Sequence, residues 1–176
     1  HVKDFTFVLN PAAGKGAGAR AANLVEQILK GSGLRYRTVR TEGAGHATEI
    51  ARTADTACVV AVGGDGTINE VANGLVGTGT TMAVSPTGTG NDFIKSIGVP
   101  RSVRRAMELL WSGTPRMIDA GRVETGSLAD GSIVYAPGRY FVNGVGVGFD
   151  ASVARRVAEI RWLRGTALYL LAVLQT

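Results

Sequence analysis

The sequence lacks the residues and patterns that mark several large classes of protein. It has one cysteine among 176 residues, so no disulfide framework can hold the chain together, and the place of Cys58 in the apolar run 57–62 indicates a buried residue in a reducing compartment. The most apolar segment, 167–173, is far shorter than the roughly 20 residues that span a bilayer. No charged segment followed by an apolar one stands near His1. These features favour a cytoplasmic protein whose membrane contact is peripheral.

The sequence also lacks the marks of a nucleic-acid-binding protein. Its net charge of +5 and its pI of about 9.8 suit nucleotide phosphates, an anionic membrane surface or nucleic acid equally well. However, it has no aromatic RNA-binding motif, no zinc-ligand spacing and no long run of Lys or Arg. We therefore expect no nucleic-acid partner.

Glycine, by contrast, is abundant. The chain has 25 glycines, and many stand in short clusters beside strand-like runs. Glycine permits positive φ and a close approach of the backbone to a ligand, so these clusters favour a phosphate ligand. Hydrophobic residues make up 45% of the chain, which is typical of a globular protein with room for one domain and the start of another.

Strand-like and helix-like segments alternate through the first two-thirds of the chain. Short β-branched or apolar runs predict strands, and apolar residues repeating with a period of 3.6 predict helices. The predicted strands are 5–9, 36–40, 57–62 and 81–85, and the predicted helices are 17–30, 46–53, 68–75 and 103–111. This alternation predicts an α/β fold with a parallel, Rossmann-like sheet and a ligand at the carboxyl ends of its strands.

The pattern changes after Pro115. The predicted strands are 117–123, 132–135 and 140–145, joined in part by a polar turn over 125–131, and this order predicts antiparallel structure. Two helices, 151–161 and 166–174, are predicted after them. The second has almost no polar face and must be covered, so we expect a homodimer or other association through it.

The segment Gly63–Val71 carries the strongest chemical signal. It follows a predicted buried strand, and three of its first four residues are glycines. Free backbone N–H groups and the positive end of the next helix favour a phosphate chain there. Asp65 would be repelled by phosphate unless it holds Mg²⁺ or accepts the proton of an attacking hydroxyl, and phosphoryl transfer requires both roles. The structural alternative is a capping box formed by Thr67 and Glu70.

Two further loops stand at predicted strand ends. In Pro86–Phe93, Thr89 and Asn91 offer hydrogen-bond donors to a nucleotide, or Thr89 caps the next helix with Asp92 at its third position. The segment Asn10–Gly16 is not a Walker A loop, because no Gly-Lys-Ser/Thr follows at the required spacing. All three loops follow parallel strands, so we expect them to meet at one edge of the sheet.

In this order and spacing, the three loops resemble the catalytic domain of diacylglycerol and sphingoid-base kinases. The motifs are Asn-Pro-x-x-Gly from Asn10, Gly-Gly-Asp-Gly-Thr-x-Asn-Glu-Val from Gly63, and Pro-x-Gly-Thr-x-Asn-Asp-Phe from Pro86. Gly-Gly-Asp-Gly-Thr alone also occurs in NAD kinases, but the other two motifs are lipid-kinase features. The resemblance implies an ATP-binding kinase domain over residues 1–116. It also implies the beginning of a mostly antiparallel β-sandwich, the lipid-side domain, over residues 117–176.

The resemblance also implies a site. The residues expected to bind ATP come from the three loops and from one threonine after the second strand: Asn10, Pro11, Ala12, Ala13, Gly14, Thr41, Gly63, Gly64, Asp65, Gly66, Thr67, Ile68, Asn69 and Thr89. Asp65 is implied as the catalytic residue and as a ligand of the metal. ATP and Mg²⁺ are therefore the expected cofactors.

On the lipid side, the resemblance points to Asp150, Arg155 and Arg161 as substrate-binding residues. Asp150 is similar to a position that faces the lipid head group, with an ion pair or a helix cap as the alternative. Arg155 and Arg161 have the spacing of two arginines that look like phosphate ligands in the sphingoid-base branch. A solvated basic face, or attraction to anionic lipids, would explain them equally well.

The resemblance therefore predicts a kinase that transfers the γ-phosphate of ATP to a lipid hydroxyl at a membrane surface. Diacylglycerol, giving phosphatidic acid, is the expected substrate, and a sphingoid base or a monoacylglycerol stays open. The alternatives are an NAD kinase-like enzyme and a catalytically incomplete nucleotide- or lipid-binding module. Complete members of the family return an acidic residue and further Mg²⁺ ligands from a later region. We therefore expect the chain as given to be truncated and inactive alone.

Overall fold

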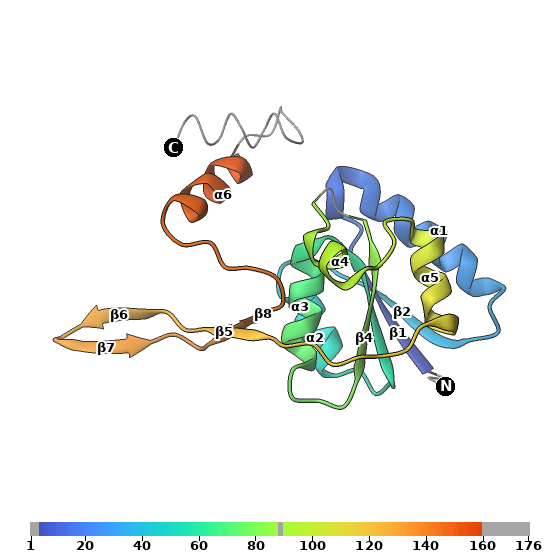
Figure 1. Cartoon of the computed structure of the whole chain (residues 1–176), viewed down its shortest axis with the longest axis horizontal. Coiled ribbons are helices and arrows are strands. Elements are labelled where there is room, and N and C mark those ends of the chain that lie inside the picture. Colours follow the sequence, from blue (N-terminus) through green and yellow to red (C-terminus); the bar gives the residue numbers. More distant parts are fainter. Residues whose placement is uncertain (1–3, 88–89, 160–176) are drawn as a thin grey trace. The chain divides into compact units, whose positions relative to one another are not determined.

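Four parallel strands form the centre of the protein, as the alternation predicts. The computed structural model describes residues 4–87 and 90–159. The strands are β1 (Asp4–Leu9), β2 (Arg35–Arg40), β3 (Cys58–Gly63) and β4 (Thr81–Pro86). They lie in the order β2-β1-β3-β4, and every neighbouring pair is parallel (Figure 1). The central strands β1 and β3 are buried almost throughout, because helices cover both faces of the sheet.

The helices divide the core into two layers. On one face lie α1 (Ala17–Lys30), which follows the short 3₁₀ turn η1 (Ala13–Gly16), and α5 (Val103–Ser112); on the other lie α2 (His46–Arg52), α3 (Asp65–Leu75) and α4 (Asp92–Ile97). Val25 and Leu29 of α1 pack with Met107 of α5 in the first layer. Ile68 of α3 and Phe93 of α4 pack together in the second. The α/β fold class is thus confirmed.

The strand order places a topological switch point between β1 and β3. After β1 the chain crosses to β2 on one side, and after β2 it returns to β3 on the other. Such a reversal leaves a crevice at the carboxyl ends of the two central strands. Asn10 follows β1 and Gly64 follows β3, so two of the predicted loops meet at that crevice.

The antiparallel part after α5 is confirmed; the strand predicted over 132–135 has the predicted bounds, and the other two are shorter than predicted. β5 (Gly121–Val123) pairs with β8 (Arg139–Phe141), and β6 (Gly126–Ala129) pairs with β7 (Ser132–Tyr135). The strand predicted over 117–123 is wrong in its first half: residues 117–120 have no regular structure, and Met117 is 96% exposed. The strand predicted over 140–145 ends at residue 141. In both cases the regular strand extends only over the three residues that pair between β5 and β8.

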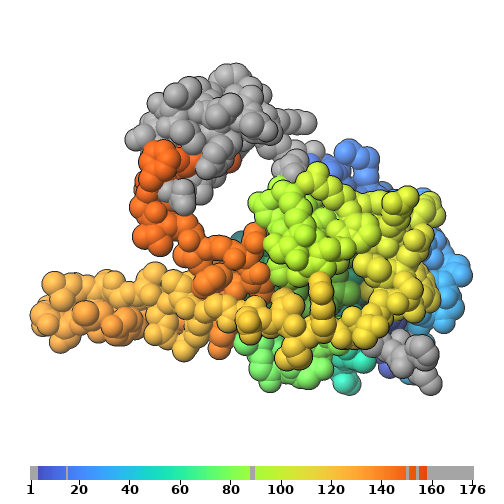
Figure 2. Space-filling model, viewed as in Figure 1, coloured from blue at the N-terminus to red at the C-terminus, as the bar shows by residue number. Residues whose placement is uncertain are grey.

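The polar turn predicted over 125–131 is also wrong, because most of it is strand β6. The turn itself has two residues, Asp130 and Gly131, with φ of 48° and 76°. Asp-Gly at positive φ is a favoured two-residue hairpin turn. Every residue of β6 and β7 is exposed, as the hairpin in Figure 2 shows. The hairpin is therefore polar because solvent surrounds its strands, and the sequence analysis interpreted this polar composition as a loop.

The chain divides into two units, residues 1–143 and 144–176. In the second, the described helix is α6 (Phe149–Glu159), which begins two residues before the predicted helix 151–161. The predicted helix 166–174, and with it the expected homodimer, lies outside the described residues. The domain boundary expected at residues 116/117 stays a prediction. Within the part of the chain that the structure describes, no helix has the length and apolarity needed to cross a bilayer.

Candidate functional site

A side-chain hydrogen bond joins the loops after β1 and β3. Asn10 Nδ2 donates to Thr67 Oγ1 over 2.8 Å, and Asn10 Oδ1 accepts the N–H of Ala12 over 3.0 Å. Thr67 is only 5% exposed, so water competes little for this bond. Asn10 therefore fixes both its own loop and the start of α3 across the switch point.

The start of α3 offers unpaired backbone donors. The helix begins at Asp65 after an extended Gly64, and no side chain caps it. Ile68 N–H bonds to the Gly64 carbonyl oxygen over 3.0 Å, as the first backbone bond of the helix. The N–H groups of Asp65, Gly66 and Thr67 therefore have no partner within α3. Together with the positive end of an 11-residue helix they form a place for an anion.

The expected capping box of Thr67 and Glu70 is wrong. Because α3 starts three residues earlier than predicted, Thr67 is the third helical residue and faces the loop after β1. Glu70 Oε2 instead accepts the N–H of Ala47 in the first turn of α2 over 3.2 Å. The Glu70 carbonyl oxygen accepts a bond from Thr48 Oγ1 over 2.9 Å. Glu70 thus ties α3 to the start of the neighbouring helix.

The carboxylate of Asp65 lies between two loops. Its Oδ1 accepts the N–H of Phe93, in the first turn of α4, over 3.2 Å. Its Oδ2 lies 3.1 Å from the position that a Cβ on Gly90 would take. The residue that caps α4 is Asn91, held at φ 51°, rather than Thr89, which lies outside the described residues. Both oxygens of Asp65 therefore face the third loop. Oδ1 accepts a hydrogen bond from it, and Oδ2 lies next to Gly90.

The loops after β1 and β4 touch as well. Gly14 has φ +62°, and a Cβ there would stand 2.7 Å from the carbonyl oxygen of Thr87. Only glycine fits both this backbone conformation and this approach. Thr87 N–H in turn bonds to the Gly63 carbonyl oxygen over 3.0 Å. The three loops meet at one edge of the sheet, as predicted.

A cleft of about 440 Å³ opens between the loops after β1, β2 and β3, on the α2 and α3 side of the sheet. It is lined by Asn10, Ala12, Ala13, Gly14, Thr41, Glu42, Gly43, Ala44, Ala47, Gly64, Gly66, Thr67 and Glu70. The sequence analysis named all of these as ATP-binding residues except the five from the segment after Thr41, the start of α2 and the middle of α3. Those five carry no phosphate-binding pattern of their own.

Some predicted residues do not line this cleft. Ile68 is fully buried in the core, and its N–H is used inside α3. Gly63 is buried and ends β3. Pro11, Asp65 and Asn69 are half-buried next to lining residues. The structure therefore brings most of the predicted set together, and the role of each residue toward ATP stays a prediction.

The cleft is lined by both carboxylates and backbone donors. Glu42, in the segment after β2, and Glu70, in the middle of α3, contribute the carboxylates, and the start of α3 contributes N–H groups. No Lys or Arg is among the lining residues; Lys15 lies in η1, but its side chain is outside the described part. Across residues 4–87 and 90–159, no three His, Cys, Asp or Glu side chains are grouped as a metal site. A metal held by Asp65 would need further oxygen ligands, and phosphate oxygens and water are among those that Mg²⁺ commonly uses.

Besides the lining residues that it did not name, the sequence analysis missed the structural roles of Gly18 and Glu70 at this edge. A Cβ on Gly18, in the first turn of α1, would stand 2.3 Å from the carbonyl oxygen of Asn10. The run of alanines and glycines from residue 12 to 22 was the available signal for such a close approach. Glu70 was read only as a capping residue, because its partner on α2 is 23 residues away.

The predicted substrate-side residues are not assembled by the described structure. Arg155 is exposed on α6, the Asp150 side chain is outside the described part, and Arg161 lies beyond residue 159. Cys58 is buried as predicted, and burial raises the pKa of its thiol to about 12. It therefore has a packing role and no thiolate chemistry near neutral pH.

The fold and the edge site match a known family. Residues 4–123 match the sequence profile of the diacylglycerol kinase catalytic domain. The chain belongs to this family. A diacylglycerol kinase from Bacillus subtilis (strain 168) is 34% identical over 153 residues, which cover 84% of this chain and 46% of that one. Sphingoid long-chain bases kinase 1 of Arabidopsis thaliana is 35% identical over 119 residues, which cover 60% of this chain and 16% of that one.

The solved structures agree with this assignment. The crystal structure of a diacylglycerol kinase from Bacillus anthracis str. Sterne superposes with a TM-score of 0.57 at 26% sequence identity, over 75% of this chain and 48% of that chain. The chain spans about half the length of the first relatives that it matches.

Proposed function

We propose that the protein is an ATP-dependent lipid kinase and that diacylglycerol is its substrate. The observation that carries this proposal is the placing of a carboxylate, Asp65, in the first turn of an uncapped helix at the rim of the switch-point cleft. A phosphate site built on backbone donors has no use for a carboxylate unless phosphate is to be transferred.

The residues that line the cleft offer hydrogen-bond partners to both the phosphates and the nucleoside of ATP. The free N–H groups of Asp65, Gly66 and Thr67 would bind phosphate oxygens. Thr41 and the carboxylates of Glu42 and Glu70 would face the hydroxyl and amino donors of ribose and adenine. A Cβ at Gly14 would press on the loop after β4, so glycine there keeps the phosphate end open.

Asp65 has two possible roles in the transfer, and the chain can support both. As a base, its carboxylate accepts the proton of the lipid hydroxyl while that oxygen forms a bond to the γ-phosphorus and the bond to the β-γ bridging oxygen breaks, releasing ADP. As a metal ligand, it contributes Oδ2, which accepts no backbone bond within residues 4–87 and 90–159. Mg²⁺, when bound, would neutralise charge on the β- and γ-phosphates.

Support for the lipid part comes from the relatives. The Bacillus subtilis relative is named a diacylglycerol kinase, and the Arabidopsis one a kinase of sphingoid bases. We assign the lipid side to the region from residue 117, with Asp150, Arg155 and Arg161 facing the head group and phosphate. Peripheral binding to a membrane and association between copies of the chain belong to the same proposal.

Phosphate transfer by the full-length protein tests the proposal. Labelled ATP and Mg²⁺ are supplied with diacylglycerol vesicles, sphingosine or NAD in parallel, and label is expected in diacylglycerol. Label in sphingosine would correct the substrate, label in NAD alone would overturn the lipid-kinase function, and binding of ATP–Mg²⁺ without transfer to any acceptor would leave only a binding module.

A matched pair of variants tests the role of Asp65. Asp65→Asn keeps an oxygen for the N–H of Phe93, so the fold is expected to persist while the transfer rate falls by about 10²-fold or more. Asp55→Asn makes the same change at the amino end of β3 and is expected to leave the rate unchanged. Equal rates in both variants would remove Asp65 from the mechanism.

A further inference from the structure

A second cleft lies on the α1 and α5 side of the sheet, away from the lining of the nucleotide cleft. It has a volume of about 330 Å³, is open to solvent and is bordered by α1, the carboxyl end of β4 and the segment that leads into α5. Its polar lining consists of Arg20, Thr87, Asn91 and Arg101, and Ala17 and Leu24 contribute apolar surface. The proposed lipid kinase reaction uses neither the two arginines nor the side chain of Thr87.

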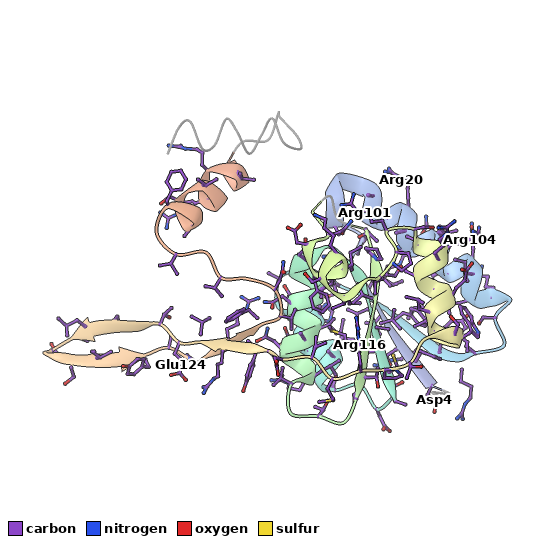
Figure 3. All side chains as sticks on the ribbon, in the orientation of Figure 1. Asp4, Arg20, Arg101, Arg104, Arg116 and Glu124 are labelled. Carbon is purple, nitrogen blue, oxygen red and sulfur yellow. The ribbon has the colours of Figure 1, made fainter. Side chains whose placement is uncertain are left out.

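The two arginines give this cleft a positive charge that no carboxylate balances. Arg20 and Arg101 are both exposed, and Figure 3 shows them at the same end of the α1 face, with Arg104 farther along α5. None of the ion pairs within residues 4–87 and 90–159 uses either arginine. Arg20 Nη1 lies 3.9 Å from the position that a Cβ on Gly16 would take, beside the start of α1. Guanidinium groups placed in this way bind phosphate oxygens through paired N–H donors.

One lining residue, Thr87, also carries a buried hydroxyl, and a helix end lies beside the cleft. Thr87 is 8% exposed, and its Oγ1, which is closed off from solvent, has no hydrogen-bond partner in the described part of the chain. α1, which has 14 residues, begins at Ala17 with no side-chain cap and no acidic residue in its first turn. The positive end of that helix therefore adds to the charge of the arginines.

We propose that this cleft is a second phosphate site, separate from the nucleotide site, which binds a phosphomonoester group. Its volume is near the lower end of the ~300–1,000 Å³ typical of ligand pockets, so it suits a phosphate and its first carbon substituent rather than a whole nucleotide. Leu24 supplies an apolar contact for that substituent. The same chemistry is offered by a free phosphate and by the head group of a lipid phosphomonoester.

Binding measured with the nucleotide cleft filled tests the proposal without relying on kinase activity. The full-length protein, saturated with a non-hydrolysable ATP analogue and Mg²⁺, is titrated with inorganic phosphate. In parallel it is sedimented with phosphatidylcholine vesicles that contain or lack phosphatidic acid. We expect binding in the presence of the analogue. Binding to phosphate identifies a free phosphate as sufficient, whereas binding only to phosphatidic acid vesicles identifies the lipid head group as the source.

Two double variants separate a built site from general surface charge. Arg20→Ala with Arg101→Ala is expected to weaken binding by about tenfold or more, because hydrogen bonds to charged groups are among the strongest in proteins. Arg104→Ala with Arg105→Ala removes the same charge outside the cleft and is expected to weaken it by less than about threefold. Equal losses in the two double variants would overturn the proposal. So would displacement by the ATP analogue, or no binding of either probe at millimolar concentration.

A single variant guards against loss of folding. Thr87→Val removes the unpaired hydroxyl at nearly constant volume, so thermal stability is expected to hold or rise. Because that hydroxyl is closed off from solvent, phosphate affinity is expected to stay the same. A stable variant that has lost phosphate affinity would overturn the assignment of binding to the two arginines.

Discussion

At Gly18, the absence of a side chain decides whether the loop after β1 can close. A Cβ there would stand 2.3 Å from the Asn10 carbonyl oxygen and 2.9 Å from that of Ala13. By helix propensity alone, Gly18→Ala should stabilise α1 by about 1 kcal/mol. We expect the opposite sign, a loss of about 1–3 kcal/mol in the free energy of unfolding, because two backbone oxygens must move. Urea denaturation measures the change.

The control for Gly18 is a glycine with free space around it. Nothing lies within 4 Å of a Cβ on Gly79, whose φ is ordinary for an L-residue, so Gly79→Ala is expected to be neutral or slightly stabilising. Since Gly18 supports Asn10, ATP binding should also weaken in Gly18→Ala and not in Gly79→Ala. A Gly18→Ala protein as stable as the parent would contradict the close approach.

Cys58 predicts a pH dependence with a definite sign. Burial raises the pKa of its thiol from 9.0 to about 12, so the folded protein holds this proton more tightly than the unfolded chain does. The stabilisation from the neutral thiol is complete below pH 9.0 and is lost as the pH rises from 9.0 toward 12. The free energy of unfolding should therefore decline above pH 9 more steeply in the parent than in Cys58→Val. At pH 8 the thiol should resist iodoacetamide until the protein is unfolded, and rapid alkylation of the native protein would contradict its burial.

Among the elements, α3 holds β8, the last strand of the antiparallel region. Asn73 Nδ2 donates to the Tyr140 carbonyl oxygen over 2.8 Å, and Asn73 Oδ1 accepts the Tyr140 N–H over 2.9 Å. The amide of Asn73 thus pairs with β8 as a neighbouring strand would. We expect Asn73→Ala to lower the free energy of unfolding by about 1–3 kcal/mol, because it leaves two backbone groups without these partners. The amide hydrogen of Tyr140 should also exchange faster.

An exposed asparagine provides the control for Asn73. Asn23 accepts one bond from Arg40 over 3.3 Å on the surface, and Asn23→Ala is expected to change stability by less than about 0.5 kcal/mol. If both substitutions have the same small effect, the pairing of Asn73 with β8 does not contribute to the free energy of unfolding.

The elements also show what the sequence can and cannot predict. The parallel strands were predicted within one residue at each end. For the central strands β1 and β3 the signal is the continuous apolar run that burial on both faces requires. α3 was predicted three residues late, since glycines at a helix start have low helix propensity. β7 was predicted with its exact bounds, whereas β6 was missed because it has no buried face and hence no alternation to detect. Contacts such as those of Glu70 and Asn73 join distant segments through single side chains, and no local pattern encodes them.

On the scale of the whole molecule, protection should follow burial. Backbone groups of β1 and β3 bond to strands on both sides and lie under both helical layers, so their amide hydrogens should exchange only by global unfolding. β6 and β7 bond only to each other within the described chain, and every residue of both is exposed. Their amide hydrogens should exchange through local opening, several orders of magnitude faster.

Adding ATP–Mg²⁺ should change this exchange pattern at one place first. The N–H groups of Asp65, Gly66 and Thr67 have no partner within α3, so a bound phosphate is expected to slow their exchange strongly. The hairpin serves as an internal control, because it takes no part in the cleft, and its exchange should stay the same. Hydrogen exchange followed by mass spectrometry with and without nucleotide measures both effects in one sample. Slowing spread evenly over the hairpin and the start of α3 would point to a general rise in stability, whereas no slowing at residues 65–67 would mean that these donors do not hold the phosphates.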